Sequence, residues 1–318
     1  MRIYPDRMHL GAATQVGPLS IFPVWTEARS NFAHITSHRQ GVTFAELDEP
    51  QVNRLQVTNE SNRALLVPEG TVLQGARQTR TLCRDFLVMP GRSRELDVMC
   101  VEQGRWGGEG DATMIGRVPA GIIAEIRDIT PQGMSGASTR QSRVWSRVNN
   151  YETRYGTRST SSYESILNMR DDDRERGNQD AEERIMRERN LIAGFRAQLD
   201  QLVANPLPGQ AGVMVGALGH PVLLEMFGSG QAFREQVGQI LTAAVLDVPE
   251  IQQIATPTYR AHRFAEAIMD NELVHQSATT LTGGDHVVNI RCLGPVNGSK
   301  VALHTSVINP RHELVLAK

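Results

Sequence analysis

The amino-acid sequence predicts an α+β protein: a β-rich N-terminal half, forming an antiparallel sandwich-like sheet, with helices mainly in the C-terminal half. Short apolar segments follow one another at intervals of about 10 residues up to residue 106, without helical periodicity between them. After residue 140, apolar residues recur at helical spacing. The 318 residues are enough for one large domain or two smaller ones, because chains longer than about 250 to 300 residues tend to divide.

The expected N-terminal strands are bounded by turn residues. The tetrapeptide ESNR separates two short apolar segments, and a loop this short predicts that they pair as a hairpin. Pro90 and Gly91 separate two further segments, which predicts a second hairpin. The strands predicted here are Leu19–Trp25, Val52–Thr58, Ala64–Val67, Thr81–Met89 and Arg94–Val101.

The rest of the chain mixes helices with strands. The run from Asp171 to Asn190 is almost entirely charged and leads into apolar residues at helical spacing up to Leu202, which predicts a solvated helix with one apolar stripe. Prolines at 206 and 208 should end this helix. The other predicted helices are Gln141–Asn149, Gln231–Leu246 and Thr258–Asn271, and the predicted strands are Val213–Leu218, Val222–Phe227, Val287–Leu293 and Lys300–Ile308.

Composition and charge exclude several classes of protein. The formal charge is only −2, from 33 Lys and Arg residues against 35 Asp and Glu residues, so we expect neither nucleic acid nor a membrane as partner. No apolar stretch approaches the roughly 20 residues that span a bilayer, and the first residues do not resemble a secretory signal. Three cysteines are too few for a disulfide scaffold. Together these features predict a cytoplasmic protein.

The segment Glu69 to Arg80, EGTVLQGARQTR, concentrates polar residues directly after a predicted strand. Glycine lets backbone amides approach a ligand, and arginine presents forked donors that match phosphate or carboxylate oxygens. Glu69, Gly75, Arg77, Gln78 and Arg80 are therefore candidates for binding an anion. The alternative is an ordinary turn with solvated arginines. The segment is neither a Walker loop nor a dinucleotide-binding fingerprint.

The segment Cys100 to Trp106, CVEQGRW, ends another predicted strand. Strand alternation places Cys100 and Glu102 on one face, and a thiol beside a carboxylate would need a histidine, such as His304, to act as a nucleophile. A buried and inert Cys100 is the alternative. With no Cys-x-x-Cys pair in the sequence, we predict no metal site and no cofactor. Catalytic groups remain unassigned, with Glu102, Cys100 and His304 as candidates.

The order of these two segments resembles the bacterial and archaeal family named for its association with ADP-ribosylglycohydrolases and rhodanese-phosphatases, the ARPP family. Its usual pattern is close to GEELxGAKQNRxL followed by VSCVEQGRW. Arg77 stands where that pattern has lysine, and Thr79 where it has asparagine. The resemblance extends over most of the chain, is weakest over Arg154 to Ala204, and includes GPLSIFPVW from Gly17, QSRVW from Gln141, PGQAGVMV from Pro208, LLEMFGS from Leu223 and ALHTSVI from Ala302.

The resemblance implies a single ARPP-like domain over residues 8–311. Within it, residues 1–106 form the β-rich part, 107–205 an irregular and helical connection that contains the charged helix, and 206–318 an α+β part. The family name points to ADP-ribose or NAD-derived metabolites. It implies phosphate contacts from Arg77, Arg80 and Arg105, a ribose contact from Glu69, Glu102 or Gln78, and base stacking on Trp106.

Two functions from different classes remain open at this point. The chain binds or processes an ADP-ribose-type or NAD-type nucleotide, or it is a noncatalytic interaction module whose carboxylates, Glu69 or Glu102, pair with the arginines internally. Whether the protein is an enzyme is left undecided, and a homo-oligomer is not excluded.

Overall fold

The computed structural model describes residues 2–3, 7–27, 35–36, 40–130, 136, 139–157, 162–168, 179–248, 253–269, 273–274, 279–283, 286–294 and 302–316. The chain divides into two compact units, each described here by itself. The first unit comprises Met1–His38 and Ala197–Ala317, and the second is essentially Arg39–Arg196. The boundary falls within helix α5 (Gln179–Ala204).

The predicted α+β class is confirmed. Helices account for 34% and strands for 35% of the structure, the sheets are antiparallel, and the strands are mostly N-terminal whereas the helices are mainly C-terminal. None of the helices in the described part of the chain is long and apolar enough to cross a membrane.

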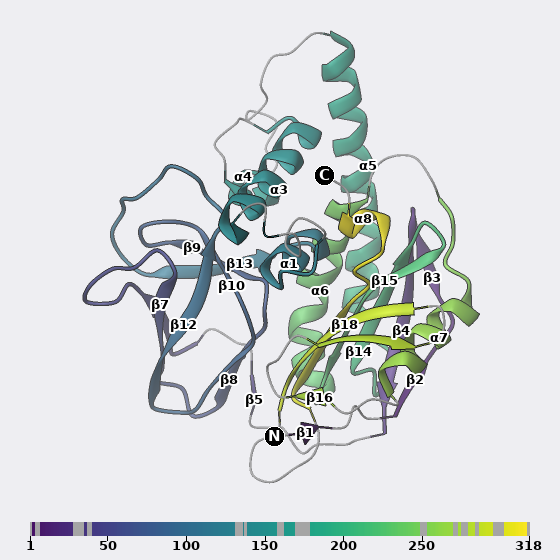
Figure 1. The fold of residues 1–318 in the computed structure, drawn as a ribbon, viewed down its shortest axis with the longest axis horizontal. Helices are drawn as coiled ribbons and strands as arrows, with labels where there is room; N and C mark the ends of the chain where they lie inside the picture. The colour runs from purple at the N-terminus through teal and green to yellow at the C-terminus, as the bar shows by residue number, and fades with distance from the viewer. Residues whose placement is uncertain are drawn as a thin grey trace. The chain divides into compact units, whose positions relative to one another are not determined.

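The second unit is built on a closed antiparallel barrel (Figure 1). Side chains that alternate along its strands fill the interior with Leu55, Val57, Leu73, Leu96 and Val98, all at most 3% exposed, as expected for a small barrel. In barrel order the strands are β10 (Arg80–Leu82), β12 (Arg92–Cys100), β7 (Arg54–Asn59), β6 (Val42–Ala45), β13 (Ala112–Arg117) and β9 (Thr71–Gly75).

The first predicted hairpin is wrong in its pairing. Both strands exist, but β8 (Ala64–Val67) pairs with β11 (Phe86–Val88), while β7 pairs with β6 and β12. Asn59 at the end of β7 is buried and donates hydrogen bonds to the carbonyls of Arg63 and Val88. This amide links the turn after β7 to the end of β11, next to Pro90 and Gly91, and β8 pairs with β11 and not with β7.

The second predicted hairpin is confirmed in its register. β10 and β12 pair antiparallel from Arg80 opposite Cys100 to Leu82 opposite Val98, a register that centres on the turn at Pro90 and Gly91. The predicted continuous strand is interrupted at residues 83–85, where the Asp85 carboxylate accepts a hydrogen bond from the Glu69 amide at 2.7 Å.

Helices of the second unit are α1 (Ala120–Ile126), α3 (Arg140–Tyr155), α4 (Tyr163–Asn168) and the N-terminal part of α5. The predicted helix from Gln141 is confirmed, and it extends to Tyr155. Thr139 caps its N-terminus and Gly156, at φ +56°, ends it in the left-handed conformation. The predicted charged helix is confirmed from Gln179 onward, whereas residues 171–178 lie outside the described part of the chain.

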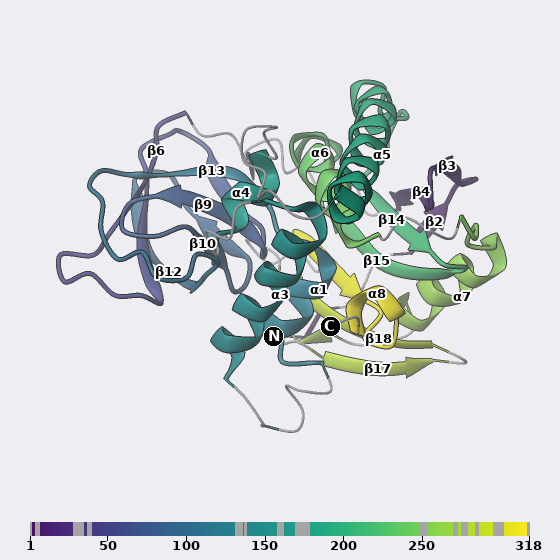
Figure 2. The same ribbon diagram turned by 90° about the horizontal axis from the view of Figure 1, so that it is seen from above.

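The first unit contains an eight-stranded antiparallel sheet that joins the N-terminal strands to the C-terminal ones (Figures 1 and 2). The strands predicted at Leu19–Trp25, Val213–Leu218, Val222–Phe227, Val287–Leu293 and Lys300–Ile308 are present, the last one from His304. The first two C-terminal strands pair antiparallel with each other, and so do the last two. The strand order is β17 (Thr279–Gly283), β18 (His286–Leu293), β19 (His304–Ile308), β15 (His220–Phe227), β14 (Gly212–Ala217), β4 (Leu19–Thr26) and β2 (Met8–Leu10), with β3 (Thr14–Val16) also paired to β4.

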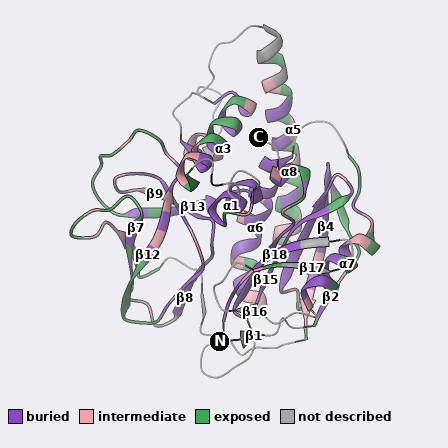
Figure 3. Cartoon of the chain, viewed as in Figure 1, coloured by how far each residue is buried: buried purple, intermediate pink, exposed green. Residues whose placement is uncertain are grey.

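Two helices cover opposite faces of this sheet. Phe22 and Val24 of β4 pack with Phe264 of α7 (Thr258–Met269), whereas the alternating residue Ile21 faces Phe233 of α6 (Gly230–Asp247). Strands β14 and β15 between them are almost wholly buried (Figure 3). Short elements β1 (Arg2–Ile3), β5 (Ile35–Thr36), β16 (Leu273–Val274) and α8 (Glu313–Leu316) complete the described chain.

Candidate functional site

Barrel closure brings the two polar segments of the sequence together. β9 and β10 are antiparallel neighbours, so the loop of residues 76–79 lies at the end of the barrel where β10 begins. Arg80 at that end pairs directly with Cys100, the last residue of β12. The loop therefore meets the CVEQGRW segment, and we call the group formed by Glu46, Arg77, Gln78, Thr79, Arg80, Glu102, Arg105 and Trp106 the arginine–tryptophan cluster.

Gly75 shapes the chain rather than offering a side chain to the cluster. Its φ is +106°, and Ala76 follows at φ +49°, so both residues are in conformations that L-amino acids rarely adopt. A Cβ on Gly75 would lie 2.9 Å from the carbonyl oxygen of Asp111. The predicted ligand-binding residue Gly75 is thus required by the turn itself and by the close approach of β13.

Glu102 and Arg105 form a bidentate ion pair. Arg105 Nε donates to Glu102 Oε1 at 2.6 Å and Nη2 donates to Oε2 at 2.8 Å, while the amide of Thr79 donates to the same Oε2 at 2.8 Å. Burial alone would raise the pKa of Glu102, but the bonds from Arg105 and Thr79 lower it more, so its pKa lies below the ordinary value. Glu102 is therefore an ionised carboxylate that fixes the loop, not a proton donor.

Arg80 is fully buried, and its guanidinium is poorly satisfied. Nη1 lies 3.0 Å from Glu46 Oε1, yet none of the three guanidinium nitrogens makes an aligned hydrogen bond to any described residue. Four oxygens of the same region, Gln78 Oε1, Thr79 Oγ1, Thr81 Oγ1 and Glu46 Oε2, are also buried without a hydrogen-bond partner among the described residues. Buried polar groups are normally satisfied, so this concentration is unusual.

Trp106 and Arg77 form the accessible side of the cluster. The Cζ atoms of Arg77 and Arg80 both lie 5.5 Å from the centre of the Trp106 ring, within the range of cation–π attraction. Trp106 is 43% exposed. Among the described residues the guanidinium of Arg77 has no carboxylate partner, although its backbone amide donates to Glu46 Oε1 at 3.0 Å.

Glu69 does not join the other predicted site residues. It lies in the turn before β9, at the opposite end of that strand from Gly75, and its side chain is completely buried against Arg127, whose Nη2 lies 2.6 Å from Glu69 Oε2. The pair connects the barrel to the end of α1. A buried carboxylate with this partner holds the fold together and contacts no solvent.

The candidate catalytic residues Cys100 and His304 both have structural partners. The Cys100 thiol donates to the Glu102 carbonyl oxygen at 2.6 Å, and burial raises its pKa, which keeps it a protonated and weak nucleophile. His304 lies in the first unit, where its Nε2 is 2.7 Å from Glu225 Oε2 and its side chain is fully buried. The described residues contain no group of three or more His, Cys, Asp or Glu side chains that could hold a metal ion.

Sequence reasoning missed Glu46 and the backbone of Thr79. Glu46 follows β6 and reaches the cluster only because β6 closes the barrel against β13, a pairing that no local pattern near residue 46 indicates. Thr79 stands out in the sequence only as a departure from the family pattern, yet the donor that reaches Glu102 is its amide, which every residue except proline provides.

The fold and the cluster together define an α+β protein whose antiparallel barrel carries a cationic and aromatic group at one end. A family model described as "ARPP-1: ARG and Rhodanese-Phosphatase-superfamily-associated Protein domain" matches residues 7–309, so the chain belongs to this family. The comparisons with curated proteins and with solved structures returned no match.

Proposed function

We propose that the arginine–tryptophan cluster binds a phosphorylated nucleotide of the ADP-ribose or NAD type, which the protein holds or processes there. Arg77 and Arg80 would contact the phosphates, and Trp106 would stack on the base. The observation that carries this proposal is the fully buried guanidinium of Arg80, which lacks aligned hydrogen bonds among the described residues and lies 5.5 Å from a half-exposed tryptophan. Phosphate oxygens are the acceptors that such a fork fits best.

The charge of the cluster favours an anion. The cluster contains three arginines, Arg77, Arg80 and Arg105, and two carboxylates. Glu102 is paired with Arg105, and Glu46 lies beside Arg80. Arg77 is the one arginine of the three without a carboxylate partner among the described residues, and its guanidinium lies over the Trp106 ring. One unpaired positive charge beside a second, loosely paired one attracts a diphosphate without any need to break the Glu102–Arg105 bond.

Access to Arg80 requires Trp106 to move. Gly107 follows this tryptophan directly, and the nearby Gly104 and Gly108 have φ values of +92° and +136°, so three glycines close to the ring lack the steric limits that Cβ atoms impose. Displacing the ring from Arg80 would expose the guanidinium and leave the indole face available for a base.

The family description agrees with this ligand class but does not define it. It records an association with ARG and with the rhodanese-phosphatase superfamily, which makes ADP-ribose the first compound to test. Glu102 and Arg105 have positioning roles in this proposal, and Glu69 has no role in binding.

A second function has its own observation in favour. The bidentate Glu102–Arg105 pair and the buried Glu69–Arg127 pair are what a noncatalytic module would use to fix its barrel internally. In that case the cluster holds the structure together and binds no metabolite.

Isothermal titration with ADP-ribose, NAD and adenosine separates the two functions. The informative variants are Arg77→Ala and Trp106→Leu, both on the accessible side of the cluster, and Arg92→Ala is the matched control because Arg92 is an exposed arginine at the far end of β12. We expect ADP-ribose to bind wild type and Arg92→Ala equally, and to bind the other two variants at least about tenfold more weakly, as loss of a charged hydrogen bond or a stacked base predicts.

Adenosine, which lacks phosphates, should bind far more weakly than ADP-ribose. If neither nucleotide binds the folded wild-type protein, or if Arg92→Ala weakens binding as much as Arg77→Ala does, the nucleotide proposal fails and the internal network becomes the better account.

A further inference from the structure

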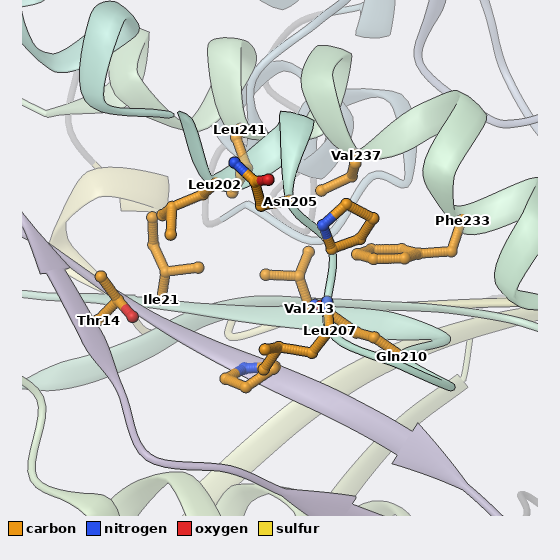
Figure 4. A pocket seen from close by; sticks show the side chains of 12 residues that line it. Thr14, Ile21, Leu202, Asn205, Leu207, Gln210, Val213, Phe233, Val237 and Leu241 are labelled. Atoms are coloured by element: carbon orange, nitrogen blue, oxygen red, sulfur yellow. The ribbon is translucent and has the colours of Figure 1, made fainter. Parts of the chain in front are cut away.

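A hollow in the first unit lies between the sheet and α6, independent of the arginine–tryptophan cluster. Its volume is about 120 Å³. Apolar side chains form its floor and walls, and Figure 4 shows those of α6 pointing down toward the sheet. The lining apolar residues are Ile21, Pro23, Leu202, Pro206, Leu207, Val213, Phe233, Val237 and Leu241.

We propose that this hollow is a binding site for a small, uncharged, mainly hydrocarbon molecule. Apolar walls with a few polar groups are the usual lining of small-molecule sites. A closed apolar cavity of about 150 Å³ admits benzene, so this open hollow of about 120 Å³ has room for a single ring or a short alkyl chain.

The absence of charge among the lining residues selects the ligand class. Besides the apolar side chains, the lining contains only Thr14, Asn205 and Gln210, all neutral. A carboxylate or phosphate placed here would lose its hydration without gaining a cationic partner, which is costly. A neutral molecule avoids this penalty.

One side of the hollow can accept a single hydrogen bond. Asn205 Nδ2 donates to the Gln201 carbonyl at 3.0 Å, which leaves its Oδ1 without a partner among the described residues. Both polar ends of Gln210 are already used, because Oε1 accepts from the Leu207 amide and Nε2 donates to the Gly212 carbonyl. The chemistry therefore fits a ligand with one hydroxyl or N–H donor on a hydrocarbon body.

The mouth of the hollow is a preformed loop. Residues 205–210 contain two prolines, whose φ values are fixed by their rings. The loop is closed by the Gln210 amide bonded to the Leu207 carbonyl at 3.0 Å, and Trp25 Nε1 donates to the Pro208 carbonyl at 2.9 Å. A rim that is already ordered loses little conformational entropy when a ligand binds.

Leu207 is the residue whose substitution tests this proposal. It is 47% exposed at the mouth of the hollow, so part of its side chain remains for a ligand to cover. Ile254, in the same unit, is 48% exposed but does not line the hollow. The two residues form a matched pair with equal exposure and different positions.

The experiment titrates phenol, a neutral single ring with one hydroxyl donor, into the full-length protein and measures binding by isothermal titration calorimetry. We expect saturable binding to wild type and to Ile254→Ser, about tenfold weaker binding to Leu207→Ser through lost apolar contact, and none to Val237→Phe, whose ring would fill the hollow. Benzoate, a ring of the same size with a carboxylate, should bind wild type at least about tenfold more weakly than phenol.

Circular dichroism establishes that each variant is folded, and Leu207→Ser keeps the test valid should Val237→Phe not fold. The proposal is overturned if phenol fails to saturate wild type, if Leu207→Ser and Ile254→Ser bind it equally, or if benzoate binds as tightly as phenol. None of these results bears on ADP-ribose binding by the other unit.

Discussion

At the scale of single residues, the arginines of the cluster differ in how far their guanidinium N–H groups are already hydrogen-bonded. Arg105 is 38% exposed, but both of its donor edges are directed at Glu102 or at backbone carbonyls. Arg77 and Arg80 both lie over the Trp106 ring, and no guanidinium nitrogen of Arg80 makes an aligned hydrogen bond to a described residue. Exposure alone therefore does not identify the arginine with unused donors, because Arg105 is exposed and satisfied whereas Arg80 is buried and unsatisfied.

Glu102→Gln tests the role of the Glu102 carboxylate. We expect the free energy of unfolding at pH 7 to fall by about 1 to 2 kcal/mol, a charged hydrogen bond discounted for the partial exposure of Arg105. Because the pKa of Glu102 is lower in the folded protein, its stabilisation is fully present above the ordinary value of 4.5 and is lost as the pH falls through the lowered pKa.

Urea denaturation of wild type and Glu102→Gln at neutral and acidic pH measures this difference. The stability gap between the two proteins should shrink as the pH falls below the ordinary carboxyl range. A gap that stays constant across the range would mean that the amide side chain of the variant destabilises the protein by its shape and that the charge of Glu102 contributes nothing.

The residue scale is also where prediction from the sequence was least complete. Arg77, Gln78, Arg80, Glu102, Arg105 and Trp106 are brought together as the two motifs indicated, but Glu69 of the same first motif is not. The strand β9 separates Glu69 from the loop by its whole length, and at roughly 3.3 Å per residue five strand residues carry the two ends well apart. The sequence motif alone does not show that its two ends lie at opposite ends of a strand.

At the scale of elements, the cluster depends on two loops that fit against each other through backbone atoms. Gly107 donates its amide to the Arg77 carbonyl at 3.2 Å, and a Cβ on Gly108 would lie only 2.4 Å from the carbonyl oxygen of Ala76. The loop of residues 76–79 and the glycine-rich segment after Trp106 are thus in direct backbone contact, which leaves no room for a side chain at Gly108.

Gly108→Ala should therefore separate the two loops, whereas Gly110→Ala should not. Both glycines have positive φ, +136° and +89°, so each substitution costs about 1 to 2 kcal/mol in backbone strain. Only Gly108 also has a carbonyl oxygen in the way, since nothing lies within 4 Å of a Cβ at Gly110. We expect a further loss of about 1 kcal/mol or more at Gly108, measured by chemical denaturation.

Intrinsic tryptophan fluorescence gives a second reading of the same pair. Gly108→Ala should shift the emission, because Trp106 moves relative to its two arginines, and Gly110→Ala should leave it unchanged. Equal stability losses with no spectral difference would show that the two loops are not coupled through Gly108.

The sequence predicted most elements but not all of their partners. Apolar periodicity locates α3 and α6, and short apolar segments locate β14 and β15, because these signals are local. The pairing of β8 with β11 is not local, and it depends on the buried amide of Asn59 reaching two carbonyls. A polar residue at a strand end gives no sign in the sequence that it will be buried.

At the scale of the whole molecule, the chain leaves its first unit and returns to it. β4 pairs with β14, and Ile21 lies opposite Val215. In the sequence, residues 39–196 of the second unit lie between these two strands. Sequence reasoning recognised both strands but expected three successive parts, since hydrophobic patterns show that a strand is buried and not which strand lies beside it. That expected division into parts stays a prediction, and the contacts divide the chain differently.

This topology predicts that the two units behave differently as fragments. Residues 39–196 are continuous and contain the whole barrel with its core, so we expect this fragment to unfold cooperatively on its own. Residues 197–317 lack β2 and β4, which leaves the edge of β14 unpaired and uncovers Met214 and Val213. An exposed apolar edge of this kind favours aggregation over folding.

The measurement is thermal and urea unfolding of three polypeptides: 39–196, 197–317, and 197–317 joined through a flexible linker to residues 1–38. The first and third should show a single cooperative transition, and the second should show none. Cooperative folding of 197–317 alone would mean that β4 adds nothing essential to the sheet. If the linked fragment fails while 39–196 folds, then the first unit requires the second in order to form, although the second folds without the first.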